Sequence, residues 1–265
     1  MMKQCIGMLR LTWVAVLILI ICLVIAFIFP VSGKAMKRLL TRRISSWIPK
    51  ALGIRLELHG MVPPVQGNVG YLVCSNHVSF VDIFVLNALI PCRFVAKKEI
   101  ASWPLFGLIA KGVGTIFIDR SKKKEVLEIG SRMAEGLKAG DAVLFFPEGK
   151  TGSGLELLPF YANLFSAATI SEAPILPVSL RYRLHNTPTT LTSYAGPESM
   201  FSIIKKIVTT PGLSVDVTAL KPIASTGKDR HTLCLETSAS IAASLDMLDA
   251  TAIKEAERKA RLEAQ

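Results

Sequence analysis

Hydrophobic residues near the start of the chain form one long run. Residues 11–33 include no charged side chain, and 11–31 consists mostly of Leu, Ile, Val, Phe and Trp. A helix of this length would measure roughly 35 Å, enough to cross the hydrocarbon core of a bilayer. A cleaved signal peptide would have a shorter apolar region and a small-x-small cleavage site, and no Ala-x-Ala directly follows the run. The pattern therefore predicts a membrane helix over about 11–31.

A second pattern begins after the break at Pro30 and Gly33. The apolar residues Met36, Leu40, Ile44, Trp47 and Ile48 recur there at spacings of three and four. Basic residues lie between them. This spacing predicts an amphipathic helix over about 34–50, able to lie among lipid headgroups or to pack on the protein's own core. The two helices would form a membrane anchor over 1–52 that either spans the bilayer or dips into one leaflet. Both arrangements keep the rest of the chain at the cytoplasmic surface.

From residue 53 onward, short apolar runs alternate with helical patterns. The predicted strands are 54–58, 70–74, 93–96, 115–118, 142–146, 175–181 and 214–220, and the predicted helices are 80–89, 122–139 and 160–171. Strands that alternate with helices predict a three-layer α/β domain, here over 53–230. We expect 231–265 to be a C-terminal helical tail.

The charge distribution changes how the total charge is interpreted. The chain of 265 residues has a formal net charge of +11, and nine basic residues precede the first acidic one, Glu57. The remaining chain is nearly balanced, with 22 basic and 20 acidic residues. The total alone would suit a nucleic-acid binder. Because the excess lies in the predicted anchor, it favours anionic membrane lipids as partner and no nucleic acid.

Signatures of cofactors are weak. The five cysteines include no C-x-x-C pair, so we expect reduced thiols on the cytoplasmic side. The histidines at 59, 77, 185 and 231 lack the spacing of metal ligands, and we expect no metal site. Gly149-Lys150-Thr151 is similar to the end of a P-loop, but Leu144 stands where its first glycine would be. The sequence therefore predicts no cofactor.

A candidate catalytic pair follows the strand predicted at 70–74. Asp82 stands five residues after His77. On a straight helix, five residues correspond to a rotation of about 500°, which would place the two side chains on different faces. If His77 lies in a turn and Asp82 in the helix behind it, the carboxylate can hold one ring nitrogen and leave the other as a base. A capping histidine with a helix-start aspartate is the alternative.

Three further blocks follow the block Asn76–Asp82 in order. They are Gly114–Arg120, Phe146-Pro147-Glu148-Gly149 and Pro174–Val178, with Lys97-Lys98-Glu99 and Pro104 between the first two blocks. With these blocks the chain resembles the lysophospholipid acyltransferase family typified by bacterial 1-acylglycerol-3-phosphate acyltransferase, over about residues 55–185 and the N-terminal helices. The resemblance implies the three-layer α/β glycerolipid-acyltransferase fold, with a mixed central sheet flanked by helices.

The resemblance also implies a reaction and a site. Family members transfer a fatty acyl group from acyl-carrier protein or acyl-CoA to a hydroxyl of a lysolipid. Carried over to this chain, His77 is the general base on the acceptor hydroxyl and Asp82 orients it. The positions that line the substrate site would be Asn76, Lys97, Arg120, Glu148, Gly149 and Lys150.

One departure from the family pattern leaves the acceptor open. In members that acylate glycerol phosphate, the block that here includes Glu148-Gly149 usually reads Glu-Gly-Thr-Arg. This chain has Lys150-Thr151 after Gly149. A lysine ammonium group is a point charge and cannot bind a phosphate with two parallel hydrogen bonds, as an arginine guanidinium group can. The change therefore weakens or rearranges phosphate recognition. The stretch 158–165 also looks like that of lyso-ornithine lipid acyltransferases.

We therefore expect an inner-membrane enzyme, with its catalytic domain on the cytoplasmic side, that converts 1-acylglycerol-3-phosphate to phosphatidic acid. The alternative acceptor is a lyso-ornithine lipid or another lysophospholipid. An alternative of a different class is a catalytically inactive, membrane-anchored lipid-binding protein.

Overall fold

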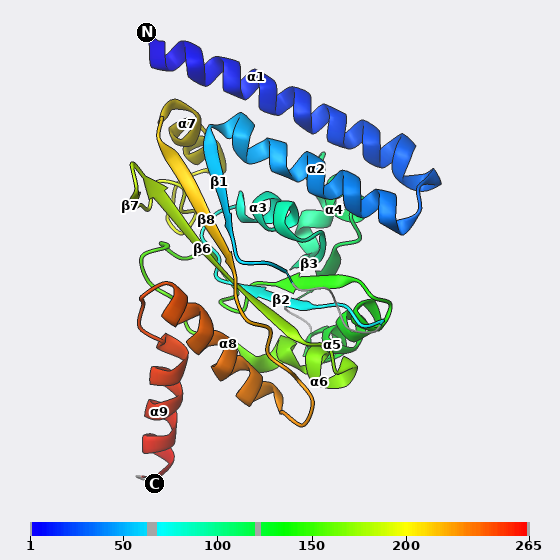
Figure 1. Cartoon of the computed structure of the whole chain (residues 1–265), viewed down its shortest axis with the longest axis vertical. Helices are drawn as coiled ribbons and strands as arrows, with labels where there is room; N and C mark the ends of the chain where they lie inside the picture. Colours follow the sequence, from blue (N-terminus) through cyan, green and yellow to red (C-terminus); the bar gives the residue numbers. More distant parts are fainter. Residues whose placement is uncertain (1, 63–67, 120–122, 264–265) are drawn as a thin grey trace.

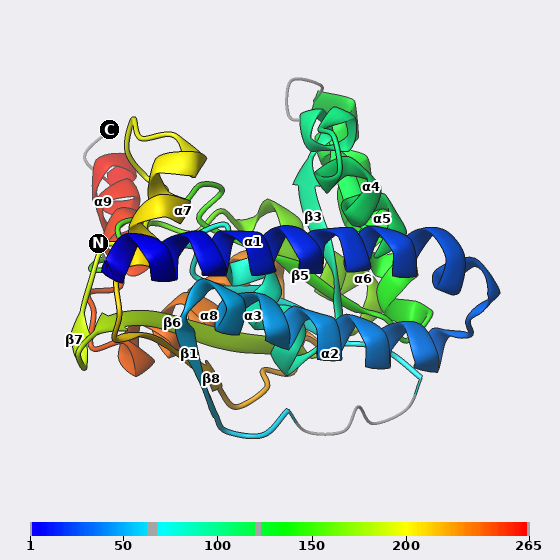
Figure 2. The same ribbon diagram turned by 90° about the horizontal axis from the view of Figure 1, so that it is seen from above.

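The computed structural model of the chain describes residues 2–62, 68–119 and 123–263. It begins with two antiparallel helices, α1 (Met2–Leu23) and α2 (Lys34–Leu52), which lie across one end of the molecule (Figures 1 and 2). A π-helical turn (Val24–Ile28) and a 3₁₀ turn (Phe29–Val31) lead from α1 to the connection. The apolar helix starts earlier than the expected residue 11, since Arg10 is accommodated by donating a hydrogen bond to the carbonyl oxygen of Val208 (2.8 Å).

The helical hairpin has one buried and one exposed apolar face. Leu17 and Ile21 of α1 are buried against the rest of the chain, whereas Leu9 and Phe27 are each 72% exposed. Among the described residues, one helical stretch, Ile6–Val31, is long and apolar enough to cross a membrane, and 22% of its most apolar window is buried. The exposed face therefore lacks a covering partner within the described chain.

Helix α2 combines the two roles that its pattern allowed. In its second half, Ile44, Ile48 and Leu52 are buried, and the helix lies against α3 (Asp82–Leu89). Its exposed side includes Met36, which is 48% exposed. The helix is thus part of the core and part of the apolar surface.

Behind the hairpin lies one mixed sheet. In the described chain its strand order is β1-β8-β6-β2-β5-β3-β4, with β7 beside β6. Neighbouring strands pair in parallel, except that β6 pairs antiparallel with both β8 and β7. The strands are β1 (Ile54–His59), β2 (Leu72–Ser75), β3 (Cys92–Lys97), β4 (Ile116–Ile118), β5 (Ala142–Phe145), β6 (Ile175–Leu184), β7 (Thr187–Pro188) and β8 (Leu213–Ala219). β2 and β5 are buried along their whole length, as expected for central parallel strands covered on both faces.

Helices cover both faces of this sheet and create two hydrophobic cores. The core on one face includes residues of α1, α2, α3 and α7, and the core on the other face includes residues of α5, α6 and α8. The remaining helices are α4 (Phe106–Gly112), α5 (Lys123–Lys138), α6 (Ser166–Ser171), α7 (Met200–Thr209), α8 (Arg230–Ser244) and α9 (Ala250–Glu263). The predicted three-layer α/β fold with a mixed sheet is confirmed.

The C-terminal region differs from the expected tail. Leu233 and Ile241 of α8 are fully buried in the second core, so this helix belongs to the domain. Helix α9 extends from the end of α8 (Figure 1). Its side chains are mostly exposed. The helix expected over 160–171 is divided into a 3₁₀ turn (Ala162–Phe165) and α6.

Candidate active site

His77 lies in the loop that leaves the central strand β2. β2 pairs in parallel with β5 and β6, and ligands of such sheets bind outside the carboxyl ends of the strands. The imidazole stacks on the ring of Phe146, which follows β5, with centroids 3.7 Å apart and an interplanar angle of 8°. Its Nδ1 lies 2.8 Å from Asp82 Oδ2. No protein group in the described chain hydrogen-bonds to its Nε2, which leaves that nitrogen available to a substrate.

Asp82 is fully buried at the start of α3. Besides the His77 ring, its Oδ2 accepts hydrogen bonds from the N–H groups of Val78 (2.7 Å) and Ser79 (2.9 Å). These backbone donors fix the carboxylate in one orientation and stabilise its charge. The arrangement inferred for this spacing, with the histidine in a turn and the aspartate in the helix behind it, is present.

A tyrosine that the sequence analysis missed completes this network. The hydroxyl of Tyr182, on β6, donates to Asp82 Oδ1 at 2.6 Å. Burial raises the pKa of Tyr182 well above its ordinary value, and the neighbouring Asp82 charge raises it further, so the hydroxyl stays protonated as a donor. Both oxygens of Asp82 are therefore satisfied, and its Oδ2 is held toward His77.

Glu148 ties the loop after β5 to the loop that carries His77. Its Oε1 accepts the backbone N–H of His77 at 2.8 Å, and Oε2 accepts that of Leu158 at 3.4 Å. Only 4% of the residue is exposed. This burial raises the pKa of Glu148 to about 8, although both N–H groups favour the ionised form. Its contacts are those of a residue that positions His77.

Asn76 is also buried, and its side chain binds the backbone of a neighbouring strand instead of facing a substrate. Its side-chain amide donates to the carbonyl oxygen of Leu180 (3.0 Å) and accepts the N–H of Leu180 (2.8 Å). The residue is 4% exposed. Because both polar ends bind the backbone of β6, Asn76 joins β2 to its neighbour just before His77.

The other expected binding residues are less constrained. Lys97 ends β3 and Lys150 follows Gly149; both are exposed, and neither side chain has an ion pair or hydrogen bond within the described residues. Gly149 has φ of 70°, a conformation that favours glycine and shapes the turn. Arg120 lies outside the described residues.

An apolar cavity of about 270 Å³ opens beside His77. The turn after α1 contributes Ile25 and Phe29, and α4 contributes Phe106 and Ile109. These segments lie far apart in the sequence, and α4 was not predicted at all. The cavity therefore connects the candidate base to the region where the N-terminal hairpin meets the domain.

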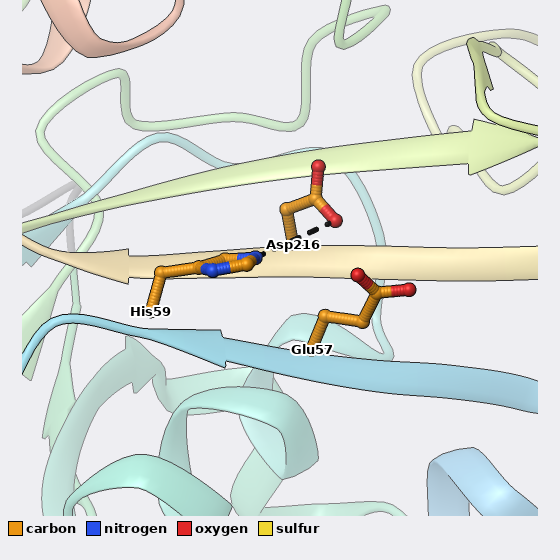
Figure 3. Close-up of side chains that lie close together, drawn as sticks. All are labelled: Glu57, His59 and Asp216. Atoms are coloured by element: carbon orange, nitrogen blue, oxygen red, sulfur yellow. Dashed lines mark ion pairs between the residues drawn. The ribbon is translucent and has the colours of Figure 1, made fainter.

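A different cluster lies at the edge of the sheet. Glu57 and His59 on β1 and Asp216 on β8 have potential metal-ligand atoms within 4.8 Å of one another (Figure 3). The sequence spacing did not predict this group, since β8 follows β1 by more than 150 residues. Each carboxylate already has an arginine: Arg55 lies 2.7 Å from Glu57, and Arg183 lies 2.6 Å from Asp216. These ion pairs give both carboxylates a positively charged partner within the protein.

Comparisons with known proteins show which family the chain is similar to. Residues 55–181 match the family model described as Acyltransferase. The chain is 46% identical over 132 residues to the 1-acyl-sn-glycerol-3-phosphate acyltransferase of Neisseria gonorrhoeae, a match that covers 50% of this chain and 51% of that protein. The match thus spans about half the length of that relative.

Two further similarities extend over more of the chain. It is 34% identical over 194 residues to the lyso-ornithine lipid O-acyltransferase of Pseudomonas aeruginosa, covering 73% of this chain and 75% of that protein. The crystal structure of the 1-acyl-sn-glycerophosphate (LPA) acyltransferase PlsC from Thermotoga maritima has the same fold, with a TM-score of 0.72 at 18% identity over 92% of this chain and 95% of that one. The family match, and a relative aligned over three quarters of its length, establish that this chain belongs to the acyltransferase family.

Proposed function

We propose that the chain is a membrane-associated O-acyltransferase that moves a fatty acyl group from a thioester donor to the free hydroxyl of a lysolipid. The observation that carries the proposal is the His77–Asp82 pair, held at 2.8 Å beside an apolar cavity. The pair supplies a base, and the cavity supplies a site for a fatty chain. The names of the relatives point to the same class of substrate.

In the proposed mechanism His77 acts as general base. Its Nε2 takes the proton of the acceptor hydroxyl while the hydroxyl oxygen attacks the thioester carbonyl carbon. The carbon–sulfur bond then breaks, and the leaving thiolate takes the proton from the imidazolium. Asp82 stabilises that imidazolium through Nδ1, and such a positioned base contributes about 10²- to 10⁴-fold in rate. The thiolate is a good leaving group, so no enzyme nucleophile is required.

The acceptor that we favour is 1-acylglycerol-3-phosphate, which would give phosphatidic acid. Lys97 and Lys150 are exposed cations without protein partners in the described chain, suited to an anionic headgroup. The 46% identity to a Neisseria protein of that activity supports this choice. A lyso-ornithine lipid is the second candidate, because the relative of that name aligns over 75% of its length. The donor would be acyl-carrier protein or acyl-CoA.

The N-terminal hairpin supports a location at the membrane. The apolar face of α1 is exposed along much of its length, while the opposite face packs on the domain. A helix attached to the domain in this way favours insertion of the hairpin into one leaflet over a separate spanning helix. The basic residues of α2 would meet anionic lipid, with the domain on the cytoplasmic side of the inner membrane.

A panel assay tests the proposal. The purified full chain in phospholipid vesicles would be incubated with labelled acyl-CoA or acyl-carrier protein and with several lysolipids. We expect transfer to 1-acylglycerol-3-phosphate with at least one donor. Transfer only to a lyso-ornithine lipid would select the second candidate, and no transfer to any acceptor with either donor would favour an inactive lipid-binding protein.

A further inference from the structure

A second cavity lies under the start of α2, away from His77. It has a volume of about 250 Å³, and its charged lining comes from three segments: Lys34, Lys37 and Arg38 of α2, Arg93 of β3, and Asp141 just before β5. β3 and β5 begin at this edge of the sheet, whereas the parallel strand β2 delivers His77 at the opposite edge. The cavity adjoins the apolar one at Phe29, Thr41 and Val113, but its charged residues lie at the opposite edge of the sheet from His77.

The lining has a surplus of positive charge. Asp141 is its one acidic residue, against four basic ones. Its carboxylate is shared between Arg38 (3.0 Å) and Arg93 (3.4 Å). The Lys37 side chain has no hydrogen bond or ion pair within the described residues. Cations gathered around one carboxylate repel one another, and a bound anion would relieve that repulsion.

The two guanidinium groups are already oriented. Arg93 also donates to the carbonyl oxygen of Gly114 (2.8 Å), and Arg38 donates to that of Gly140 (2.7 Å). These contacts fix both planar groups at the cavity wall without neutralising them. Pre-oriented arginines lose less conformational freedom on binding, and their geometry suits the oxygens of a phosphate group.

The position of the cavity indicates where the anion would come from. Its wall includes Phe29, in the turn between α1 and α2. In the same turn, Phe27 is 72% and Val31 85% exposed, and both belong to the apolar surface that we place in the lipid. A headgroup phosphate at the surface of that leaflet would lie close to Lys34 and Lys37.

We propose that this cavity binds the phosphate of an anionic phospholipid headgroup. The proposal rests on the proposed membrane association and is independent of acyl transfer. The bound lipid would hold the turn end of the hairpin at a fixed depth through side chains of α2 and β3. Phosphate in lipid and phosphate in solution share this chemistry, so the test includes both.

Lysine footprinting of the full chain gives a local readout. Acetylation rates of individual lysines would be measured by mass spectrometry with phosphatidylcholine vesicles and with vesicles that also contain phosphatidylglycerol. We expect phosphatidylglycerol to slow modification of Lys34 and Lys37 at least about fivefold, the effect of one additional charge contact. Lys50, at the other end of α2, should change much less. Equal protection of all three lysines, or protection of none, would overturn the proposal.

A charge-matched pair of variants provides the control. Lys34→Gln/Lys37→Gln and Arg43→Gln/Lys50→Gln each remove two positive charges from α2, but only the first pair lines the cavity. We expect the first variant to bind phosphatidylglycerol-containing vesicles about fivefold more weakly than the second. Equal losses would mean diffuse attraction and contradict a site.

Inorganic phosphate, compared with chloride at equal ionic strength in detergent, separates the two sources. Protection of Lys34 and Lys37 by phosphate alone assigns the cavity to free phosphate and overturns the lipid assignment, while protection by vesicles alone supports the headgroup. Neither donor nor acceptor is present, so failed acyl transfer would not affect the result. A wild-type chain that binds no vesicles would refute membrane association together with this site.

Discussion

Replacing Glu148 with glutamine tests whether this buried carboxyl is a mostly neutral anchor of the His77 loop. Burial raises its pKa to about 8, while its ordinary value is 4.5. Between these values the folded protein keeps a proton that the unfolded chain has lost, so raising the pH destabilises the fold. From about pH 5.5 to about pH 8.5 the linkage amounts to about 3 kcal/mol of unfolding free energy. For a chain of this size, that corresponds to roughly 6–12 °C in Tm.

Glutamine keeps an oxygen that can accept the His77 N–H but cannot ionise. We therefore expect the Glu148→Gln variant to lose this part of the decline in Tm and to retain acyl transfer at neutral pH. Thermal unfolding of the full chain in a nonionic detergent, at both pH values, measures the effect. Glu172→Gln is the control, because Glu172 is an exposed carboxylate that is not among the charges acting on Glu148. The same pH dependence in wild type and Glu148→Gln would show that Glu148 does not titrate in this range, and loss of transfer at neutral pH would indicate that the carboxylate itself is needed.

Three other substitutions test single contacts. Tyr182→Phe removes the hydroxyl donor of Asp82 Oδ1 and should lower the unfolding free energy by about 1–3 kcal/mol, measured by denaturant titration. Its kcat should fall less than that of Asp82→Asn, because the other carboxylate oxygen contacts His77, and an equal fall would contradict this. Asn76→Ala leaves a buried backbone N–H and carbonyl unpaired and should cost about 2–5 kcal/mol by the same titration; unchanged stability with weaker acceptor binding would restore the substrate-binding role. Ala110→Phe narrows the apolar cavity and should shift kcat/KM toward shorter donor chains by about tenfold, and an unaltered chain-length profile would place the acyl chain elsewhere.

Local patterns predicted much of the fold. The apolar runs of β2 and β5 are short and bounded by turn residues, so both strands could be identified from sequence. The His77–Asp82 contact was also predictable, since both residues belong to one strand-turn-helix segment. Helix α4 was missed because its seven residues are too few to show a helical period.

Contacts between distant segments were not predictable in the same way. Tyr182 lies 100 residues from Asp82, and no local pattern relates β6 to α3. The resemblance identified Asn76 and Glu148 as positions of the site, but their burial and backbone partners depend on how the loops and β6 meet. The apolar cavity likewise needs the hairpin turn and α4 together. Tertiary packing therefore determines which of the site residues remain accessible to substrate.

In the proposed mechanism, His77 is the base for acyl transfer. Its most direct test compares wild type with His77→Ala, each as the full chain in vesicles, by the rate of ester formation from a labelled thioester donor and the acceptor found in the panel. We expect a loss of at least about 100-fold in the variant, with unchanged vesicle binding. Turnover close to that of wild type would contradict the assignment.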